Sequence, residues 1–83
     1  MFSITVLYFA ALRDLVQKSE ERLELPARIS TVELLVRHLE STRPELAGRF
    51  GSVRIAVNES FVTLEHALQS GDIVALIPPV AGG

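Results

Sequence analysis

The middle of the chain carries one strongly amphipathic segment, and this feature limits the possible folds more than any other. Between Ser30 and Pro44, apolar residues recur at the spacing of one helix face. The apolar positions are Val32, Leu35, Val36 and Leu39. Ser30 with Glu33 three residues later forms a plausible capping box, with Thr31 as the rival N-cap. A helix with a single apolar face needs a second layer of structure to cover that face.

Strand-like segments flank this helix on both sides. They are rich in β-branched and aromatic residues, and several alternate between apolar and polar positions. Before the long helix we expect a strand over 2–9, a short helix over 10–17, a polar turn over 19–22 and a strand over 22–25. After it we expect a loop over 45–52, a strand over 53–57, a turn over 58–60, a short return strand over 61–64 and a last strand over 73–77. We therefore predict an α+β fold, in which a mixed sheet of about five strands has the long helix packed on one face and a short helix after the first strand.

Length and composition exclude several classes of function. The 83 residues allow one domain, 1–83, and the absence of cysteine excludes a disulfide framework, a thiolate metal site and a catalytic thiol. Eight basic residues against ten acidic ones give no cationic surface for nucleic acid. No apolar stretch approaches the ~20 residues that span a bilayer, and the first residues lack the pattern of a secretory signal. We expect a soluble, cytoplasmic domain that binds neither nucleic acid nor membrane.

The usual parts of an enzyme active site are scarce in this sequence. His38 falls on the polar side of the central helix beside Arg37, and His66 falls in a loop next to Glu65, so we interpret both histidines as surface residues. No acidic cluster has metal-ligand spacing, and there is no glycine-rich phosphate loop. We predict no bound metal or cofactor, and no complete active site within this chain.

The C-terminal segment 78–83, which we expect to be an extended tail, is the most unusual part of the sequence. It consists of Pro78, Pro79, Val80, Ala81, Gly82 and Gly83. The two prolines lack amide hydrogens and fix φ, so they end the preceding strand and direct its exit. The last four residues reach about 13–14 Å when extended, and glycine has no Cβ. Two terminal glycines alone fit a frayed end or an expression remnant as well as they fit a functional tail. The proline pair favours a tail that inserts into a narrow channel of another protein.

Segments along almost the whole chain also form a recognisable pattern. They are Leu7-Tyr8-Phe9-Ala10, Leu12-Arg13, Thr31-Val32, Leu35, Leu39, Ala56-Val57-Asn58, Leu68, Gly71-Asp72, Val74-Ala75 and Ile77-Pro78-Pro79-Val80-Ala81-Gly82-Gly83. Together they resemble the small subunit of molybdopterin synthase, the MoaD family. The loop over 42–52 carries no such signal. The resemblance implies a ubiquitin-like β-grasp fold, which agrees with the element order expected above.

The resemblance further implies a chemistry that the residues alone do not indicate. In this family a ubiquitin-activating-type enzyme uses ATP and magnesium to adenylate the terminal carboxylate, here that of Gly83. Sulfur then replaces the adenylate, and the thiocarboxylate tail, with Gly82, enters the large synthase subunit. There it donates sulfur to a cyclic pterin precursor. The resemblance also implies two small and two large subunits in the assembly, so this chain would be the sulfur-donating subunit in molybdenum cofactor biosynthesis.

Three residues are expected to form a docking patch near the tail. Phe9 has the opposite parity from Tyr8 in the first strand, Phe61 follows a tight turn, and Ile77 directly precedes the tail. One long helix covers only one face of a sheet, so these side chains can stay open to a partner; the alternative is that they are ordinary core. The resemblance agrees, because the matching surface docks both the large subunit and the adenylating enzyme. The predicted partner-binding residues are Phe9, Phe61, Ile77, Pro78, Pro79, Val80 and Ala81.

Three other functions stay open at this point. A thiamine-pathway sulfur carrier also ends in two glycines, although such carriers are usually shorter and lack the run from Pro78 to Val80. A ubiquitin-like protein modifier forms isopeptide bonds through a terminal glycine such as Gly83. The third alternative is an interaction domain whose terminus is never activated.

Overall fold

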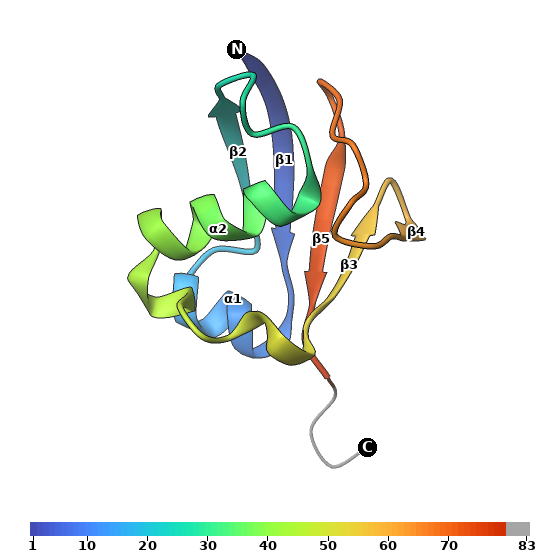
Figure 1. Ribbon diagram of the computed structural model, residues 1–83. Helices are drawn as coiled ribbons and strands as arrows, with labels where there is room; N and C mark the ends of the chain where they lie inside the picture. Colours follow the sequence, from blue (N-terminus) through green and yellow to red (C-terminus); the bar gives the residue numbers. More distant parts are fainter. Residues whose placement is uncertain (80–83) are drawn as a thin grey trace.

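The computed structural model describes residues 1–79 of the chain. The predictions about Val80, Ala81, Gly82 and Gly83 lie outside the described residues. The elements are β1 (Phe2–Tyr8), α1 (Ala10–Val16), β2 (Glu20–Leu25), α2 (Val32–Thr42), the short 3₁₀ helices η1 (Pro44–Leu46) and η2 (Phe50–Ser52), β3 (Arg54–Val57), β4 (Ser60–Phe61) and β5 (Ile73–Ile77). Figure 1 shows α2 lying across one face of the sheet.

The five strands form one mixed sheet in the order β2-β1-β5-β3-β4. Strand β1 is antiparallel to β2 and parallel to β5, while β5 is antiparallel to β3, which forms a hairpin with β4. Because β1 and β5 are parallel neighbours, their C-terminal ends meet at the same edge of the sheet, where α1 begins. The expected α+β architecture, with a short helix after the first strand, is confirmed.

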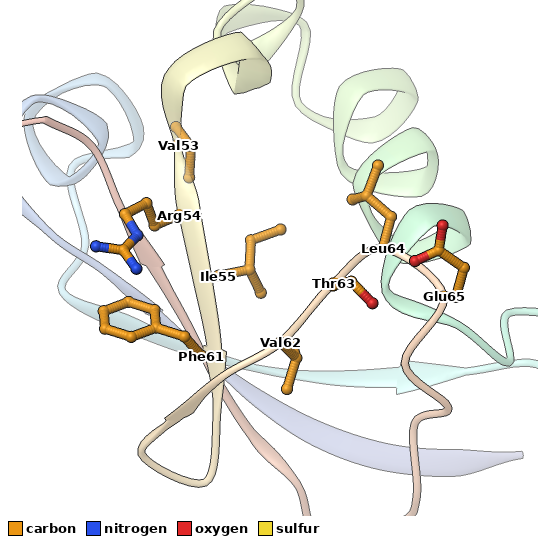
Figure 2. A pocket seen from close by; sticks show the side chains of 8 residues that line it. All are labelled: Val53, Arg54, Ile55, Phe61, Val62, Thr63, Leu64 and Glu65. Atoms are coloured by element: carbon orange, nitrogen blue, oxygen red, sulfur yellow. The ribbon is translucent and has the colours of Figure 1, made fainter.

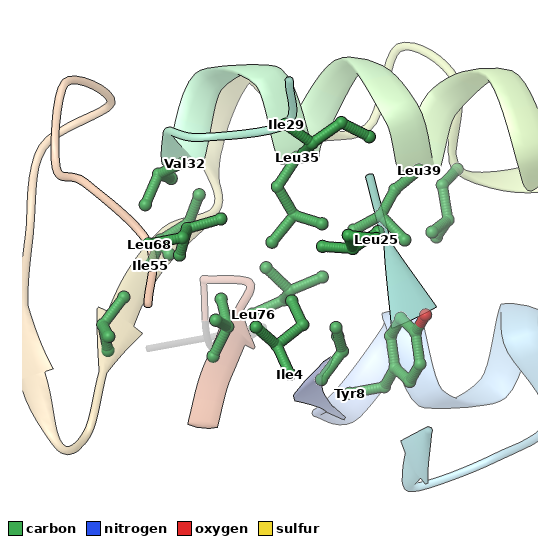
Figure 3. Packing of buried hydrophobic residues seen from close by; sticks show 14 of the residues in the cluster. Ile4, Tyr8, Leu25, Ile29, Val32, Leu35, Leu39, Ile55, Leu68 and Leu76 are labelled. Atoms are coloured by element: carbon green, nitrogen blue, oxygen red, sulfur yellow. The ribbon is translucent and has the colours of Figure 1, made fainter. Parts of the chain in front are cut away.

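The hydrophobic core lies between α2 and the sheet face that it covers (Figure 3). Ile4, Val6 and Tyr8 of β1 are at most 2% exposed, and Leu35 and Leu39 of α2 are 1% exposed. Burying a large apolar side chain of this kind contributes about 1.5–3 kcal/mol to folding. The other members of the buried cluster are Leu12, Val16, Leu25, Ile29, Val32, Leu46, Ile55, Val57, Leu68, Val74 and Leu76. The predicted inward faces of β1 and α2 therefore form the core, with Val36 only partly buried at its border.

Helix α2 starts one residue later than a Ser30 cap requires. The hydroxyl of Thr31 accepts a hydrogen bond from the Leu34 amide at 3.3 Å, so the rival cap is the one used and the Ser30 capping box is wrong. The backbone explains the choice, because the Ser30 carbonyl accepts a bond from the Leu68 amide and Thr31 forms a β-bridge with Ala67. These contacts hold the chain extended up to Thr31.

Four strands differ in their bounds from the sequence prediction. Strand β1 ends at Tyr8 and not at Phe9, and β3 begins at Arg54 and not at Val53. The polar turn expected over 19–22 is shorter, because β2 already begins at Glu20, which lies opposite Leu7 in the β1 ladder. The return strand expected over 61–64 is wrong in extent, since β4 covers only Ser60 and Phe61. After it the chain turns away to reach α2, where the carbonyl of Leu64 accepts a bond from the Glu33 amide.

The segment 45–52, expected to be a loop, contains most of η1 and all of η2. Its single deeply buried residue is Leu46, which is 0% exposed and packs into the core cluster. Leu46 is isolated among polar and small residues, so no periodicity marks it in the sequence.

Candidate functional site

The sheet face opposite α2 is not covered by any helix of the described residues, and it carries a continuous row of side chains. In the register, Leu7 lies opposite Ala75, Ala75 opposite Ala56, and Ala56 opposite Phe61. Paired residues of neighbouring strands point to the same face, so these four side chains share the open face. The two alanines form a low floor between Leu7 and Phe61, whose ring is 58% exposed.

A second row lies nearer to the C-terminal end of β5. Ile77 of β5 lies opposite Arg54 of β3, and Ile77 is half-buried while Arg54 is exposed. At the N-terminal end of β5, two residues before Ala75, Ile73 lies opposite Thr5 and is 46% exposed. The open face of β5 is therefore apolar from Ile73 to Ile77, which is the pattern of a surface that binds another protein.

Phe9 and Ile77 lie together where β5 leaves the sheet. With Ala10, Ala11, Arg13, Pro78 and Pro79 they line a shallow, largely apolar hollow of about 480 Å³. Phe9 is the N-cap residue of α1 and is 43% exposed. Four of the predicted docking residues, namely Phe9, Ile77, Pro78 and Pro79, thus surround the base of the tail. The sequence placed them together correctly.

Phe61 lies apart from that hollow and borders a second one of about 460 Å³ between β3 and the segment that follows β4 (Figure 2). The connection between the two regions is Arg54. Its guanidinium carbon lies 3.9 Å from the centre of the Phe61 ring, and its backbone pairs with Ile77. The three predicted patch residues, Phe9, Phe61 and Ile77, therefore do not form one apolar cluster, because the Arg54 side chain lies between Phe61 and the other two. Sequence reasoning missed Arg54, although its place between the inward Val53 and Ile55 already indicated an outward side chain.

The hairpin that carries Phe61 is held by a hydrogen bond between Asn58 in its turn and Asp72 just before β5. Asn58 Nδ2 donates to Asp72 Oδ1 at 3.0 Å, and the Ile73 amide donates to Asn58 Oδ1 at 3.0 Å. The Gln69 amide donates to the second oxygen of Asp72 at 2.8 Å. Asp72 is only 8% exposed, so these bonds replace its water contacts and hold the β3–β4 turn against the start of β5.

A second polar cluster joins β1, β2 and the end of α2 on the covered side of the sheet. The Tyr8 hydroxyl donates to Glu21 Oε1 at 2.9 Å, and Arg43 Nε donates to the same oxygen at 3.1 Å. Lys18 Nζ lies 3.3 Å from the other oxygen of Glu21. Burial raises the pKa of the Tyr8 phenol, although Arg43 opposes the shift. This cluster is structural, because Tyr8 is a core residue that no partner reaches.

The two histidines lie away from the open face. His66 is exposed in the turn that its amide closes with the Thr63 carbonyl, as predicted, and His38 is half-buried on α2, where it lines a hollow with Arg28. Residues 1–79 contain no group of three or more His, Asp or Glu side chains that could hold a metal ion. None of the helices described is long and apolar enough to cross a membrane. The candidate site in this part of the chain is the open apolar sheet face, with Pro78 and Pro79 at its edge.

Comparisons with known proteins define the class to which this fold and docking face belong. SAMP1 from Haloferax volcanii, a small archaeal modifier protein, superimposes with a TM-score of 0.85 at 26% identity, covering 98% of this chain and 99% of that one. The structure of subunits 1 and 2 of the molybdopterin-converting factor from Helicobacter pylori contains a chain that matches with a TM-score of 0.70 at 23% identity, covering 99% and 100%. The architecture is thus the ubiquitin-like β-grasp fold that the resemblance implied.

The sequence comparisons are more specific than the fold. The model of the ThiS family matches residues 6–83. The molybdopterin synthase sulfur carrier subunit of Escherichia coli is 43% identical over 82 residues, which cover 96% of this chain and 99% of that protein. The chain belongs to the ThiS family of sulfur carriers, and within it to the molybdopterin synthase small subunits. The resemblance drawn from the sequence is confirmed.

Proposed function

We propose that this protein carries sulfur on its C-terminal glycine for molybdopterin synthesis. The observation that carries the proposal is the 43% identity to the Escherichia coli sulfur carrier subunit over almost its whole length. The uncovered apolar face supports it, because a carrier must be held by its partners while its tail is delivered. Phe9 and Ile77 border the start of that tail at Pro78 and Pro79.

The chemistry of the proposal takes place at the carboxylate of Gly83. A carboxylate is a poor electrophile because its charge and resonance oppose attack. An adenylating partner therefore joins it to AMP, using ATP and magnesium and releasing pyrophosphate. A sulfur nucleophile then attacks the acyl carbon, AMP leaves, and a thiocarboxylate results. Like a thiolate, this group is ionised and nucleophilic near neutral pH, so its sulfur can attack an electrophilic carbon of the pterin precursor. Water then cleaves the acyl–sulfur bond, which leaves the sulfur on the pterin and restores the Gly83 carboxylate.

The large synthase subunit supplies the acid, base and anion-binding groups that residues 1–79 lack. The subunits 1 and 2 of the Helicobacter pylori factor are described as a protein–protein complex, which supports a partner of this kind. We place Phe9, Phe61 and Ile77 at that interface, with Pro78, Pro79, Val80 and Ala81 leading Gly82 and Gly83 into the partner. Two small and two large subunits form the expected assembly, and the cytoplasm is its expected location.

One second function is favoured by a specific observation. The likeness to SAMP1 from Haloferax volcanii, at a TM-score of 0.85, supports a role in which Gly83 forms isopeptide bonds with lysines of other proteins. Both functions begin with the same adenylation and differ in the acceptor. The thiamine-pathway alternative is less favoured, because the relative with 43% identity over almost the whole chain is a molybdopterin synthase sulfur carrier subunit.

The proposal is tested by the intact mass of the full chain. After incubation with the adenylating enzyme, ATP, magnesium and sulfide, the mass should rise by about 16 Da, the difference between sulfur and oxygen. The product is then mixed with the large synthase subunit and the cyclic pterin precursor, and should return to its starting mass as dithiolene forms. An unchanged mass with an enzyme that activates another carrier would refute the proposal. Transfer to protein lysines instead of the pterin would favour the modifier function.

A further inference from the structure

The open sheet face divides into a polar part and an apolar part, and a single arginine lies in the apolar part. On the polar side, Arg22 of β2 is 3.9 Å from Glu24 and donates to the Ser3 hydroxyl. On the apolar side, Arg54 lies between Ile77 and Phe61. Among residues 1–79, the salt bridges involve Lys18, Arg22, Arg37 and Arg43. Arg54, like Arg13, Arg28 and Arg49, has no carboxylate oxygen of these residues within 4.0 Å, and of these four it is the one that lies on the open sheet face.

The position of Arg54 leaves its hydrogen-bonding capacity available. The guanidinium stacks on Phe61, with 3.9 Å between its central carbon and the ring centre. Stacking occupies the face of the guanidinium, while its N–H donors lie at the edge. A planar group held in this way is pre-oriented, so it loses little side-chain entropy when a carboxylate binds to two of its N–H groups. The Phe61 ring thus acts as a support for the cation.

Burial of this face without a partner for Arg54 would be costly. A charge removed from water needs an opposite charge or several hydrogen bonds, and a purely apolar cover supplies neither. Ala75 and Ala56 lie opposite each other on this face, next to the pair of Arg54 and Ile77, and each carries only a methyl group. A partner surface that fits this face must therefore combine apolar side chains over the alanines with an acid beside them.

We propose that Arg54 determines partner choice, and that the large synthase subunit presents an Asp or Glu carboxylate to it at the centre of the interface. This proposal rests on the proposed function, because it assumes that the open face is the docking surface. It adds the chemistry of the partner: an acidic side chain surrounded by apolar ones. A protein whose surface presents a cation or only apolar groups at that point is rejected.

The test is the affinity of the full chain for the cognate large subunit, measured by calorimetry at several salt concentrations. Arg54→Glu should weaken binding at least about 30-fold, because like charges then face each other. Arg54→Lys should lose less, about 3- to 10-fold, since it keeps the charge but not the paired N–H groups. Raising the salt from about 50 mM to about 500 mM should weaken the wild-type complex, and Arg54→Gln should lose most of that dependence.

A matched control and a separate variant keep the two proposals distinguishable. Arg28→Glu makes the same change of net charge beside α2, on the covered side of the sheet, and should alter the affinity less than about 2-fold. If Arg54→Glu behaves like Arg28→Glu while Phe61→Asp still abolishes binding, the role of Arg54 is refuted and the docking face stands. If Phe61→Asp also binds normally, the docking face itself is wrong. Urea unfolding of each variant excludes loss of the fold.

Discussion

Asn58 and Asp72 are joined by a 3.0 Å hydrogen bond between the β3–β4 turn and the residue that precedes β5. The pair connects two segments that pattern reasoning treats as separate turns. Asn58 also accepts a bond from the Ile73 amide, and its own amide donates to the Ile73 carbonyl at 2.8 Å. The position of the hairpin that carries Phe61 therefore depends on this contact.

Replacing Asp72 should destabilise the protein, because it removes the contact that positions the β3–β4 turn. Asp72→Ala leaves the Asn58 amide and the Gln69 amide without their acceptors, so the free energy of unfolding should fall by about 1–3 kcal/mol. Urea unfolding measures the change. Asp14→Ala on exposed α1 is the control and should change it by less than about 0.5 kcal/mol. Equal stability of the two variants would mean that the Asp72 contact adds nothing to the fold.

Glycine at position 59 in the β3–β4 turn should make the protein more stable than the glutamate that is there now. Asn58 and Glu59 have φ angles of 50° and 71°, the left-handed pair typical of a type I′ hairpin turn. Glu59→Gly should raise the free energy of unfolding by about 0.5–1 kcal/mol, because glycine adopts this conformation without strain. Glu59→Ala removes the same side chain but keeps the strain, so it should show no gain in thermal unfolding. A glycine variant no more stable than the alanine variant would contradict this account of the turn.

The buried phenol of Tyr8 should make stability depend on alkaline pH. Burial raises its folded-state pKa, so the folded state keeps the proton where the unfolded chain begins to lose it, near pH 10. The contribution is therefore fully present below about pH 10 and is lost as the pH rises through the folded-state pKa. Tyr8 is the only tyrosine of the chain, so its ionisation can be followed by ultraviolet absorbance.

Two measurements check this prediction for Tyr8. The absorbance midpoint of the folded protein should lie above that of the urea-unfolded protein. The loss of stability between about pH 9 and pH 11 should be smaller in Tyr8→Phe, which has no phenol to ionise. A folded-state midpoint equal to or below the unfolded one would show that Arg43 outweighs burial.

Phe61 should matter for binding and little for folding. Its ring is 58% exposed, so Phe61→Asp removes an accessible interface group and leaves the core intact. We expect the affinity for the large subunit to fall at least about 30-fold, as for other aromatic interface residues. Leu34→Asp makes the same kind of change on α2, where 36% of Leu34 is exposed on the opposite side of the sheet. Calorimetry should show near-normal binding for this control, and circular dichroism should show both variants folded.

The terminal glycines should matter for transfer and not for stability. Gly82→Val and Gly83→Val widen a tip that must enter a narrow channel, so activation or sulfur transfer should collapse. Both lie beyond β5, which ends at Ile77, so the free energy of unfolding should change by less than about 0.5 kcal/mol. Intact-mass assays and thermal unfolding measure the two effects. A large drop in melting temperature would indicate that these residues pack on the domain itself.

Elements with a clear period were predictable from the sequence alone. The α2 face with Leu35 and Leu39, and the apolar run of β5, gave the two layers of the fold because periodicity reports which side is buried. Polar edge positions gave no such signal. Glu20 and Glu21 look like a turn, yet Glu20 pairs with Leu7, and Glu21 is held by Tyr8 and by an arginine distant in sequence.

The candidate site was predictable in its apolar members and not in its charged one. Phe9 and Ile77 were identified by parity, Phe61 by its place after a tight turn, and all three by the limited coverage that one helix provides. The role of Arg54 depends on the β3–β4 register, which places Phe61 within 3.9 Å of its guanidinium. No local pattern specifies a contact between residues on neighbouring strands, because register emerges only when the sheet is assembled.

The parallel pairing of β1 and β5 means that the hollow lined by Phe9 and Ile77 exists only after the chain has folded. Phe9 and Ile77 come from strands far apart in the sequence, and they line one hollow only because those strands are neighbours in the sheet. During synthesis the ribosome releases β5 last, so a nascent chain cannot display this hollow. An unfolded or proteolysed copy likewise keeps its glycines but loses the surface beside them. A partner that binds at this hollow would therefore select folded copies of the chain over unfolded ones.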